Sequence, residues 1–263
     1  MNGRELIEAL HGGRPVFGTM IASPSPRYVA AAKGAGLDFV FIDTEHTPIG
    51  RETLSWMCHL FAAAGLPPVV RVPQPDPFLA TMALDGGAEG VIFPYVESPA
   101  QAQALRGATK LRPLKGRRLG AVLAGDAELE PELADYLAQR NAGSAMILNI
   151  ESVPAIEALD AILAVPGLDA VLIGPHDLSC SLGVPEQYDH PRFEEAVRTI
   201  FAKARDAGVG AGIHYWGSID RWLAWAQAGA NLIIHSIDST LFAAALRRDL
   251  AALRDGIAGP DAS

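Results

Sequence analysis

Short apolar runs alternate with amphipathic segments along almost the whole chain. The runs are rich in β-branched and aromatic residues and predict eight strands, at 15–21, 39–43, 68–72, 90–96, 145–151, 170–174, 210–215 and 231–236. Alanine-rich amphipathic segments such as 26–36 and 191–208 predict helices between the strands. Strands that are apolar along their whole length are typical of a parallel sheet covered on both faces. Eight strand–helix units predict an α/β fold, the (β/α)8 or TIM barrel.

A doubly wound parallel sheet is the alternative fold, and it is less favoured because no GxGxxG follows the first strand. We expect a single domain over residues 1–263 that begins with a short helix at 1–12. Between the fourth and fifth strands the alternation is interrupted by a long insertion, 98–144. The insertion is predicted to hold a helix at 98–110, a basic loop at 111–120 and a second helix at 131–142. The tail, 257–263, is expected to fray.

The composition narrows the class of protein. The 263 residues are 49% hydrophobic, enough for a substantial core, and carry a formal net charge of −9. No Lys/Arg cluster offsets that acidic balance, so neither nucleic acid nor a membrane surface is an expected partner. Cys58 and Cys180 lack a CxxC spacing and indicate no disulfide framework. No signal peptide and no apolar run of ~20 residues is apparent, so we expect a cytoplasmic protein.

Polar residues gather where the predicted strands end. In a barrel of parallel strands these carboxyl ends meet at one mouth, where such folds have their active sites. The residues that the sequence places there are Asp43, Glu45, His46, Arg71, Asn149, Glu151, Asp177, His214, His235 and Ser236. The pattern therefore predicts carboxylates, an arginine and histidines around one cavity.

Glu151 and Asp177 follow the adjacent fifth and sixth strands, so their carboxylates can reach one point. A pair of carboxylates with positions left for water suits a hard divalent cation such as Mg²⁺ or Mn²⁺. The alternative is structural, because Glu151 could cap the helix that starts at SVPAIEAL and Asp177 could cap a short turn. The spacing alone leaves both interpretations open.

Arg71 ends the third strand, where a guanidinium is suited to bind a substrate carboxylate or an enolate oxygen. The alternative for Arg71 is a structural ion pair with Glu45 or Asp76. His46 follows two acids, and a histidine oriented by a carboxylate is a ready proton shuttle. Beside Arg71 and a carboxylate pair, His46 is the leading candidate for the base, with Asp43 and Glu45 as supporting carboxylates.

The lysines lie away from the predicted mouth. All four fall on predicted helices or on the insertion: Lys33, Lys110, Lys115 and Lys203. A Schiff-base enzyme on this fold needs a lysine inside the mouth, so the sequence favours a metal route to the same carbanion chemistry. The loops after the seventh and eighth strands lack a Gly-rich phosphate cradle, so a phosphorylated substrate is not expected.

Six segments carry motifs that occur together in one enzyme family. They are GLDFVFIDTEHTPI (36–49), PVVRVP (68–73), LDGGAEGVIFPYVES (84–98), KGRRLG (115–120), NIESVPAIEALDAILAVPGLDAVLIGPHDLSCSLG (149–183) and IDST (237–240). Through them the chain resembles the metal-dependent class II pyruvate aldolases of the HpcH/HpaI family over about residues 14–250. The block that ends in GPHDLS is the most specific of the six.

What the resemblance implies for single residues agrees with their places at the strand ends. Glu151 and Asp177 look like the ligands of a divalent metal, Mg²⁺, Mn²⁺ or Co²⁺. Arg71 looks like the residue that stabilises the enolate, and His46 looks like the proton acceptor. The backbone around His176 and Asp177 would hold the carboxylate of pyruvate or another 2-oxo acid.

Asp85 corresponds to an acid that the family uses to raise the basicity of the histidine. In this chain Asp85 closes a helix before the fourth strand, at the opposite end of its own barrel from His46. Both statements hold only if Asp85 reaches the His46 of a neighbouring copy. Since the family forms hexamers, the resemblance implies a homo-hexamer with an active site shared across subunits.

Three positions depart from the family pattern. Asn149 stands where the family has a glutamine, which is one methylene longer. His176 stands where a small residue is common, and His214 replaces an apolar residue. All three are candidates for substrate binding, and they affect the expected aldehyde more than the pyruvate half.

The resemblance implies a carbon–carbon lyase of the aldehyde-lyase type. Such an enzyme reversibly cleaves 4-hydroxy-2-oxo acids, giving pyruvate through an enolate, and an aldehyde. An acyl-CoA lyase, a citrate-forming condensation or an oxaloacetate decarboxylase could use the same site, and a metal-independent isomerase is a weaker option. A non-catalytic barrel that binds 2-oxo acids is the alternative of another class.

Overall fold

Eight parallel strands close into a barrel in chain order in the computed structural model, which describes residues 1–258. The strands are β1 (Val16–Met20), β2 (Phe39–Asp43), β3 (Pro68–Arg71), β4 (Gly90–Phe93), β5 (Ala145–Asn149), β6 (Ala170–Ile173), β7 (Gly210–Tyr215) and β8 (Leu232–Ile237). β1 pairs with both β2 and β8, which completes the ring. The predicted (β/α)8 barrel is confirmed, and the alternative of a doubly wound sheet is wrong.

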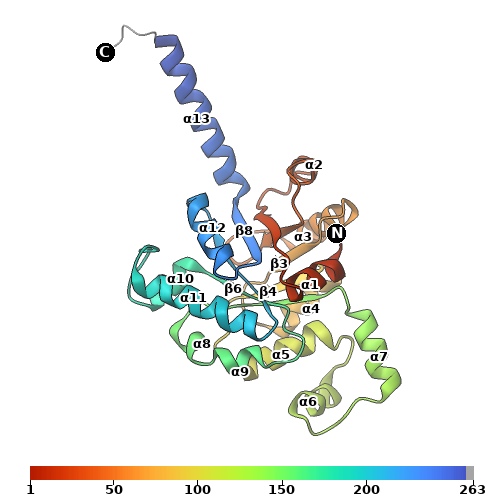
Figure 1. Cartoon of the computed structure of the whole chain (residues 1–263). Helices are drawn as coiled ribbons and strands as arrows, with labels where there is room; N and C mark the ends of the chain where they lie inside the picture. The colour runs from red at the N-terminus through yellow and green to blue at the C-terminus, as the bar shows by residue number, and fades with distance from the viewer. Residues whose placement is uncertain (259–263) are drawn as a thin grey trace.

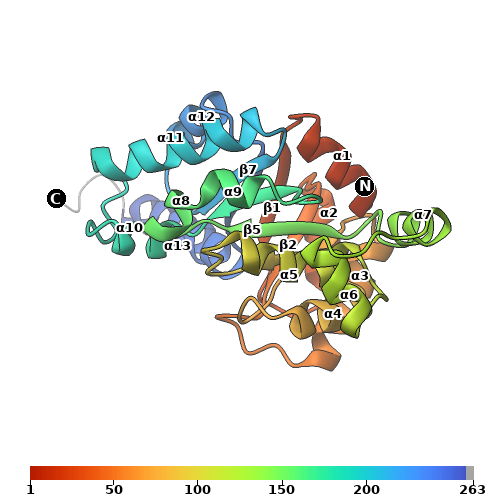
Figure 2. The same cartoon turned by 90° about the horizontal axis from the view of Figure 1, so that it is seen from below.

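Helices alternate with the strands around the barrel (Figures 1 and 2). They are α1 (Gly3–His11), α2 (Arg27–Gly34), α3 (Arg51–Ala63), α4 (Pro77–Asp85), α5 (Pro99–Lys110), α6 (Gly116–Ala124), α7 (Pro131–Arg140), α8 (Val153–Glu157), α9 (Leu159–Leu163), α10 (Pro175–Ser181), α11 (Pro191–Asp206), α12 (Ile219–Gln227) and α13 (Asp238–Ala258). Side chains that accept a first-turn amide cap α1, α4 and α5, namely Asn2, Asp76 and Ser98. The predicted helix at 1–12 is confirmed as α1.

The insertion between β4 and β5 is more helical than the sequence pattern predicts. α5 and α7 lie where helices are expected, but α6 begins at Gly116, inside the segment predicted as a basic loop. The cause is amphipathicity, because Leu119 and Leu123 of α6 pack on the bare backbone of Gly107 in α5. A Cβ added to Gly107 would stand 3.0 Å from Leu123 Cδ1. α6 and α7 project from one side of the barrel (Figures 1 and 2).

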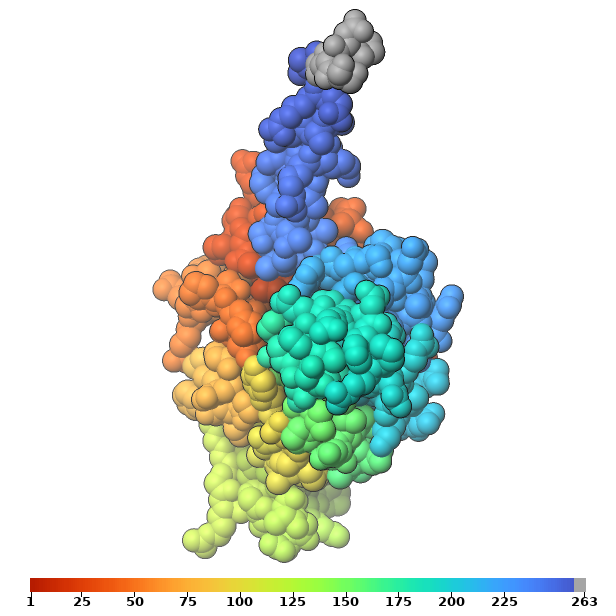
Figure 3. Space-filling view, turned by 90° about the vertical axis from the view of Figure 1, so that its left-hand side faces the viewer, coloured from red at the N-terminus to blue at the C-terminus, as the bar shows by residue number. Residues whose placement is uncertain are grey.

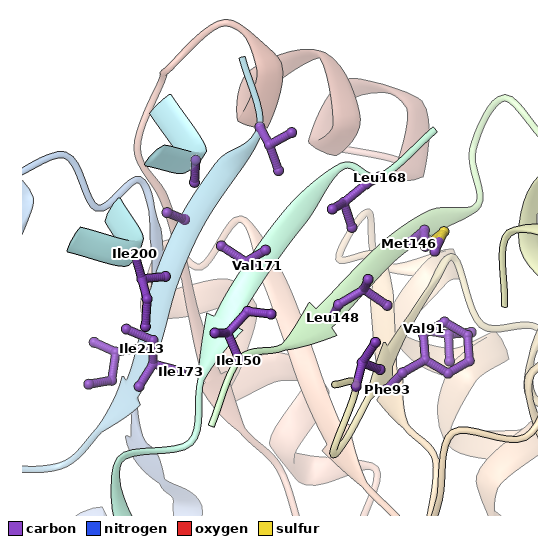
Figure 4. Packing of buried hydrophobic residues seen from close by; sticks show 14 of the residues in the cluster. Val91, Phe93, Met146, Leu148, Ile150, Leu168, Val171, Ile173, Ile200 and Ile213 are labelled. Carbon is purple, nitrogen blue, oxygen red and sulfur yellow. The ribbon is translucent and has the colours of Figure 1, made fainter. Parts of the chain in front are cut away.

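Apolar side chains fill both faces of the barrel strands. The inner face holds a cluster that includes Phe39, Phe41 and Ile147, and α1 closes the amino end of the barrel by burying Leu6 and Leu10 in it. The outer face packs against the surrounding helices through a second cluster (Figure 4), which includes Val91, Phe93, Met146, Leu148, Ile150, Leu168, Val171, Ile173, Ile200 and Ile213. Two buried faces explain why the strands are apolar at successive positions and not at alternate ones.

A polar network ties α1 to the amino end of the barrel. Asp169 is 2% exposed and accepts hydrogen bonds from Lys110 Nζ at 2.6 Å and from the Met146 amide at 2.7 Å. His11 places Nε2 at 3.0 Å from Asp169 and Nδ1 at 2.8 Å from the Gly208 carbonyl. The bond to Asp169 raises the pKa of His11 above its ordinary value, against the opposing effect of burial.

The last helix, α13, leaves the barrel instead of packing on it, as the dark blue helix in Figures 1 and 3 shows. Its exposed apolar residues recur at helical spacing: Phe242, Leu246, Leu250, Leu253 and Ile257. The barrel wall at β1 is correspondingly bare, because Phe17, which points away from the inner cluster, is 49% exposed. Although α13 has 21 residues, no helix within residues 1–258 is long and apolar enough to cross a membrane.

The tail is predicted to fray from residue 257, and α13 includes 257 and 258. The rest of that prediction concerns 259–263, which lie outside the described residues. The strand boundaries also differ from the sequence pattern at two places that matter for function. β4 ends at Phe93 and β5 at Asn149, so Tyr95 and Glu151 lie on loops beyond the strand ends.

Candidate active site

The carboxyl ends of the strands open onto a cavity of about 420 Å³. Seven of the residues predicted for the site line it: Asp43, His46, Arg71, Asn149, His176, Asp177 and His214. They come from β2, β3, β5, α10 and β7 and the adjoining loops, segments that are far apart in the sequence. The closed barrel therefore gathers at one mouth the polar residues that follow its strands.

Arg71, the last residue of β3, is held by two carboxylates from the end of β2. Nε and Nη2 each donate to Asp43 at 2.8 Å, one bond to each oxygen, and Nε lies 3.1 Å from Glu45 Oε2. The sheet register places Asp43 beside Arg71, so strand pairing itself brings them together. Within residues 1–258 no hydrogen bond uses Nη1, which leaves that edge of the guanidinium for an anionic group.

The structural alternative for Arg71 is therefore correct for Glu45 and wrong for Asp76. Asp76 accepts a hydrogen bond from the Phe78 amide and caps α4. The ion pair does not remove Arg71 from a role in binding, because the side chain also lines the cavity.

Burial and charge act in opposite directions on these three groups. Burial raises the pKa of Asp43, but the hydrogen bonds and charge of Arg71 outweigh it and lower the pKa overall. Burial lowers the pKa of Arg71, and the hydrogen bonds that Arg71 donates to Asp43, with the charges of the nearby carboxylates, more than reverse this. For Glu45 burial prevails over the charge of Arg71, so its pKa is raised. Asp43 and Arg71 therefore form a stable ion pair, while Glu45 is the more readily protonated of the two acids.

Tyr95 connects Glu151 with Asp177. The amide of Tyr95 donates to Glu151 Oε1 at 2.8 Å, and its hydroxyl donates to Asp177 Oδ1 at 2.9 Å. The other oxygen of Glu151 accepts a bond from Asn149 Nδ2 at 2.9 Å. The capping alternative is wrong for Glu151, because Ser152 caps α8, and α10 begins without a side-chain cap.

These two carboxylates fit a divalent cation. Burial raises the pKa of Glu151 to about 7; the Tyr95 amide lowers it and the charge of Asp177 raises it. A cation would relieve this unfavourable charge. Asn149 Oδ1 is buried without a partner and is a further oxygen at the site. No cluster of three or more His, Cys, Asp or Glu side chains within residues 1–258 is placed to hold a metal. A cation would therefore keep positions for water or substrate, as Mg²⁺ commonly does.

His46 lies at the rim of the cavity on the loop that follows β2. Its side chain is 62% exposed, and Nε2 lies 3.7 Å from Glu45 Oε2. Asp43 shapes this loop by accepting from the Glu45 amide at 3.0 Å and from the His46 amide at 3.4 Å. An accessible imidazole beside carboxylates can exchange a proton with a molecule in the cavity.

Two further histidines line the cavity at different depths. His176 is exposed at the rim, with Nδ1 at 3.4 Å from Glu186 Oε1. His214 lies deeper on β7, and its Nε2 is 3.0 Å from the Ser236 carbonyl. Burial lowers the pKa of His214 to about 4. His235, also expected at the mouth, does not line the cavity.

Asp85 lies outside this cavity. It is the last residue of α4, and its exposed carboxylate accepts a hydrogen bond from Arg112 Nη1 at 2.9 Å. It lines a different cavity of about 750 Å³, formed by residues of α3, α4, α5 and α6. His46 does not line that cavity, so a role for Asp85 toward His46 requires a second copy of the chain.

Tyr95 is the site residue that the sequence pattern does not predict. The pattern extends the fourth strand to residue 96, where Tyr95 would be one more strand residue. In the structure β4 stops at Phe93, and Tyr95 adopts a positive φ of 52° that turns the chain into the mouth. The available signal is Pro94, because proline cannot continue a central strand.

Comparison with known proteins gives one consistent result. The family model described as HpcH/HpaI aldolase/citrate lyase matches residues 17–245. A 2-keto-3-deoxy-L-rhamnonate aldolase of Escherichia coli (strain K12) is 32% identical over 255 residues, which cover 96% of this chain and 94% of that protein. A solved HpcH/HpaI aldolase/citrate lyase family protein from Burkholderia cenocepacia J2315 has a TM-score of 0.82 at 32% identity, covering 96% and 100%. The citrate synthase SbnG has a TM-score of 0.81 at 29% identity, covering 95% and 97%.

Proposed function

We propose that this chain, which belongs to the HpcH/HpaI aldolase/citrate lyase family, is an aldolase that cleaves a 2-keto-3-deoxy acid. The products of such an acid are pyruvate and an aldehyde, and the reaction is reversible. A substrate with a substituent at C3 would give another 2-oxo acid in place of pyruvate. The sequence-based family assignment and the aldehyde-lyase class are confirmed by the family match and the named relatives. The observation that carries the proposal is the pair formed by the buried Glu151 and the partly exposed Asp177, near the free edge of Arg71.

Glu151 and Asp177 are the residues that would hold a divalent cation, Mg²⁺, Mn²⁺ or Co²⁺. When bound, such a cation supplies Lewis-acid stabilisation of the charge that develops on the 2-oxo acid. Asn149 orients Glu151 through its 2.9 Å hydrogen bond, and Tyr95 orients both carboxylates. These contacts fix the carboxylates before the substrate arrives, which is the arrangement that preorganisation requires.

Arg71 supplies positive charge at a fixed place in the cavity. Asp43 holds two of its donor groups, and the ring centre of Phe41 lies 5.4 Å from Cζ, so the guanidinium is locked in position. A locked cation stabilises the developing enolate oxygen without reorganising during the reaction. The backbone at His176 and Asp177, in the first turn of α10, is the site we assign to the substrate carboxylate, as the resemblance implies.

His46 is the residue that transfers the proton of the hydroxyl group whose carbon becomes the aldehyde. In the cleavage direction it accepts the proton of the 4-hydroxyl group, the C3–C4 bond breaks, and the electron pair passes to the enolate. Protonation of the enolate carbon then gives the 2-oxo acid. Glu45, 3.7 Å away, stabilises the imidazolium that forms. Asp85 of a second copy would add to this effect, in line with the family resemblance.

We further propose that the enzyme is a homo-oligomer, and specifically a homo-hexamer. The apolar stripe of α13 is exposed, and Phe17 on the outer face of β1 is 49% exposed. Figure 1 shows that α13 extends away from the barrel. The α13 helix of a second copy would satisfy both surfaces at once. In the proposed hexamer, a further contact between copies would bring Asp85 to the His46 of a second chain.

A citrate-forming condensation is the second candidate, because the citrate synthase SbnG has nearly the same backbone. Both reactions pass through an enolate next to a cation, so the cavity suits either. They differ in both substrates: the aldolase joins the enolate of a 2-oxo acid to an aldehyde, whereas citrate formation joins the enolate of an acetyl thioester to oxaloacetate, and hydrolysis of the thioester releases the thiol. Product analysis with each matched pair of donor and acceptor distinguishes them.

The test follows the methyl protons of pyruvate by NMR in D₂O. With Mg²⁺ the purified protein should exchange these protons for deuterium, and EDTA should stop the exchange. Arg71→Ala should lose the exchange, while Arg192→Ala, an exposed arginine of α11, serves as a matched control. Near-normal exchange in Arg71→Ala would remove that residue from the mechanism. If the wild type shows no exchange, glycolaldehyde is added together with pyruvate. The absence of an aldol product in that experiment would contradict the proposal.

A further inference from the structure

A single polar ring interrupts an apolar wall of the active-site cavity. His214 lines the cavity between Phe41 and Trp216, whose ring centres lie 5.3 Å and 5.6 Å from its own. Met20 and Ile237 belong to the same wall, which is built from the adjacent strands β7, β8, β1 and β2. Because an unpaired polar group in such surroundings is costly, the hydrogen bonds of His214 define what this wall can bind.

The backbone of β8 determines which nitrogen of His214 carries the proton. Nε2 lies 3.0 Å from the Ser236 carbonyl oxygen, and a carbonyl only accepts hydrogen bonds, so Nε2 is the donor. Burial lowers the pKa of His214 to about 4, so the ring is neutral near pH 7. In a neutral imidazole with a protonated Nε2, Nδ1 keeps its lone pair and acts as an acceptor.

The chain is strained at the point where it presents that carbonyl. Ser236 has a φ of +60°, which is uncommon for residues other than glycine. The register pairs Gly18 with Ile234 and Met20 with Ile237, so β8 has one residue more than β1 in this interval. Such a β-bulge re-aims groups and is frequent beside active sites. Here the re-aimed group is the carbonyl that fixes the tautomer of His214.

Nδ1 of His214 is open to the cavity. It is not among the fully buried polar atoms without a partner, in contrast to Nδ1 of His235 on the neighbouring strand. No hydrogen bond from residues 1–258 reaches it. A lone pair attracts a donor and repels carboxylate, phosphate and carbonyl oxygens, which carry lone pairs of their own. Among the groups of a small oxygenated substrate, the hydroxyl is the one that donates.

We propose that Nδ1 of His214 accepts a hydrogen bond from a hydroxyl group of the substrate and selects hydroxylated substrates. The inference rests on the proposed aldolase function and names the chemical class of its substrate. The hydroxyl group has two possible sources. It belongs either to the 2-oxo acid, as in 3-hydroxypyruvate, or to the aldehyde, as in glycolaldehyde.

The test measures kcat/KM for aldol addition with two matched pairs of substrates. One pair is 3-hydroxypyruvate and pyruvate with a common aldehyde, and the other is glycolaldehyde and acetaldehyde with pyruvate. The wild type should prefer the hydroxylated member of one pair by about 10- to 100-fold, because the other member leaves the acceptor unpaired. The pair that shows the preference identifies the molecule that carries the hydroxyl group.

Two variants separate the hydrogen bond from the intrinsic reactivity of the substrates. His214→Leu removes the acceptor at similar size and should lower the preference by about 10- to 100-fold. His214→Asn places an amide near the position of Nδ1 and should retain most of the preference. An equal preference in the wild type and the leucine variant, or an equal loss in both variants, overturns the inference.

The experiment distinguishes a failure of the inference from a failure of the aldolase proposal. Turnover in the wild type without preference in either pair contradicts the role of His214 alone. No turnover with any of the substrates contradicts the aldolase function and, with it, the inference. The wild-type comparison needs no variant, so the absence of any preference overturns the inference even if the leucine variant does not fold.

Discussion

Cation binding at the active site should depend steeply on pH, because Glu151 must lose its proton first. Burial raises the pKa of this carboxyl to about 7, so the carboxylate form is the minor one below that pH. A group of that pKa is about 9% ionised at pH 6 and about 91% ionised at pH 8. Since a cation binds only the ionised form, the Kd for Mg²⁺ should fall about tenfold between pH 6 and pH 8.

Isothermal titration calorimetry measures this coupling directly. Titrations of MgCl₂ at pH 7 in two buffers with different ionisation enthalpies should reveal the release of about half a proton per cation. Glu151→Gln should abolish binding, and Glu195→Gln, an exposed acid of α11, serves as the matched control. A Kd that changes less than twofold from pH 6 to pH 8 would refute the reasoning, as would unchanged binding in Glu151→Gln.

The same group links the stability of the cation-free protein to pH. The pKa of Glu151 is about 7 in the folded protein, against an ordinary value of 4.5. Because the folded value is raised, its contribution to stability is full below 4.5 and is lost as the pH rises through 7. The loss from this one group is about 3 kcal/mol, since each unit of pKa is ~1.4 kcal/mol. Urea unfolding at pH 5 and pH 8 should show most of this difference, about 2.5 kcal/mol, in the wild type and not in Glu151→Gln, and Mg²⁺ should remove it.

Three further outcomes are expected. Asp43→Asn breaks the buried bond to Arg71, so activity should fall by more than about 100-fold and urea unfolding should show a loss of roughly 3 kcal/mol. The raised pKa of His11 means that its bond to Asp169 stabilises the fold below pH 6.5 and that this contribution is lost as the pH rises through the raised value. Thermal melts from pH 5.5 to 8.5 should therefore lose part of their pH dependence in His11→Asn. Leu246→Glu charges the apolar stripe of α13 and should shift the wild-type oligomer to a smaller species in sedimentation velocity; an unchanged sedimentation coefficient contradicts the proposed role of that stripe.

The fold could be predicted because the pattern that specifies it repeats along the whole chain. Every strand repeats the same apolar signal, and each is separated from the next by a helix, so errors at single boundaries do not change the topology. Tyr95 could not be predicted in the same way, because its place depends on a turn of two residues after β4. The site residues at other strand ends were predictable since the carboxyl ends of a closed parallel barrel have only one place to meet.

The course of α13 shows a different limit of sequence reasoning. An amphipathic pattern such as that of Leu246, Leu250 and Leu253 predicts that one face of a helix is covered, but it does not identify the cover. For most helices of this protein, the apolar face packs against the strands of the barrel. In α13 the helix points away from the barrel (Figure 3), so the pattern does not say what covers its apolar face, and the second copy that we propose there is an inference from exposure.

Asp43 explains why this mouth can combine charge stabilisation with proton transfer. One of its edges is bonded to Arg71 through strand pairing, and its oxygens also accept the amides of Glu45 and His46. The carboxylate therefore fixes both the guanidinium that we propose faces the enolate and the loop that carries His46, the proposed base. Arg71 keeps the pKa of Asp43 low despite burial, so this function does not depend on pH in the neutral range. The charged groups at the end of β2 and β3 are tolerated in a buried place because each of them is an ion-pair or hydrogen-bond partner of another.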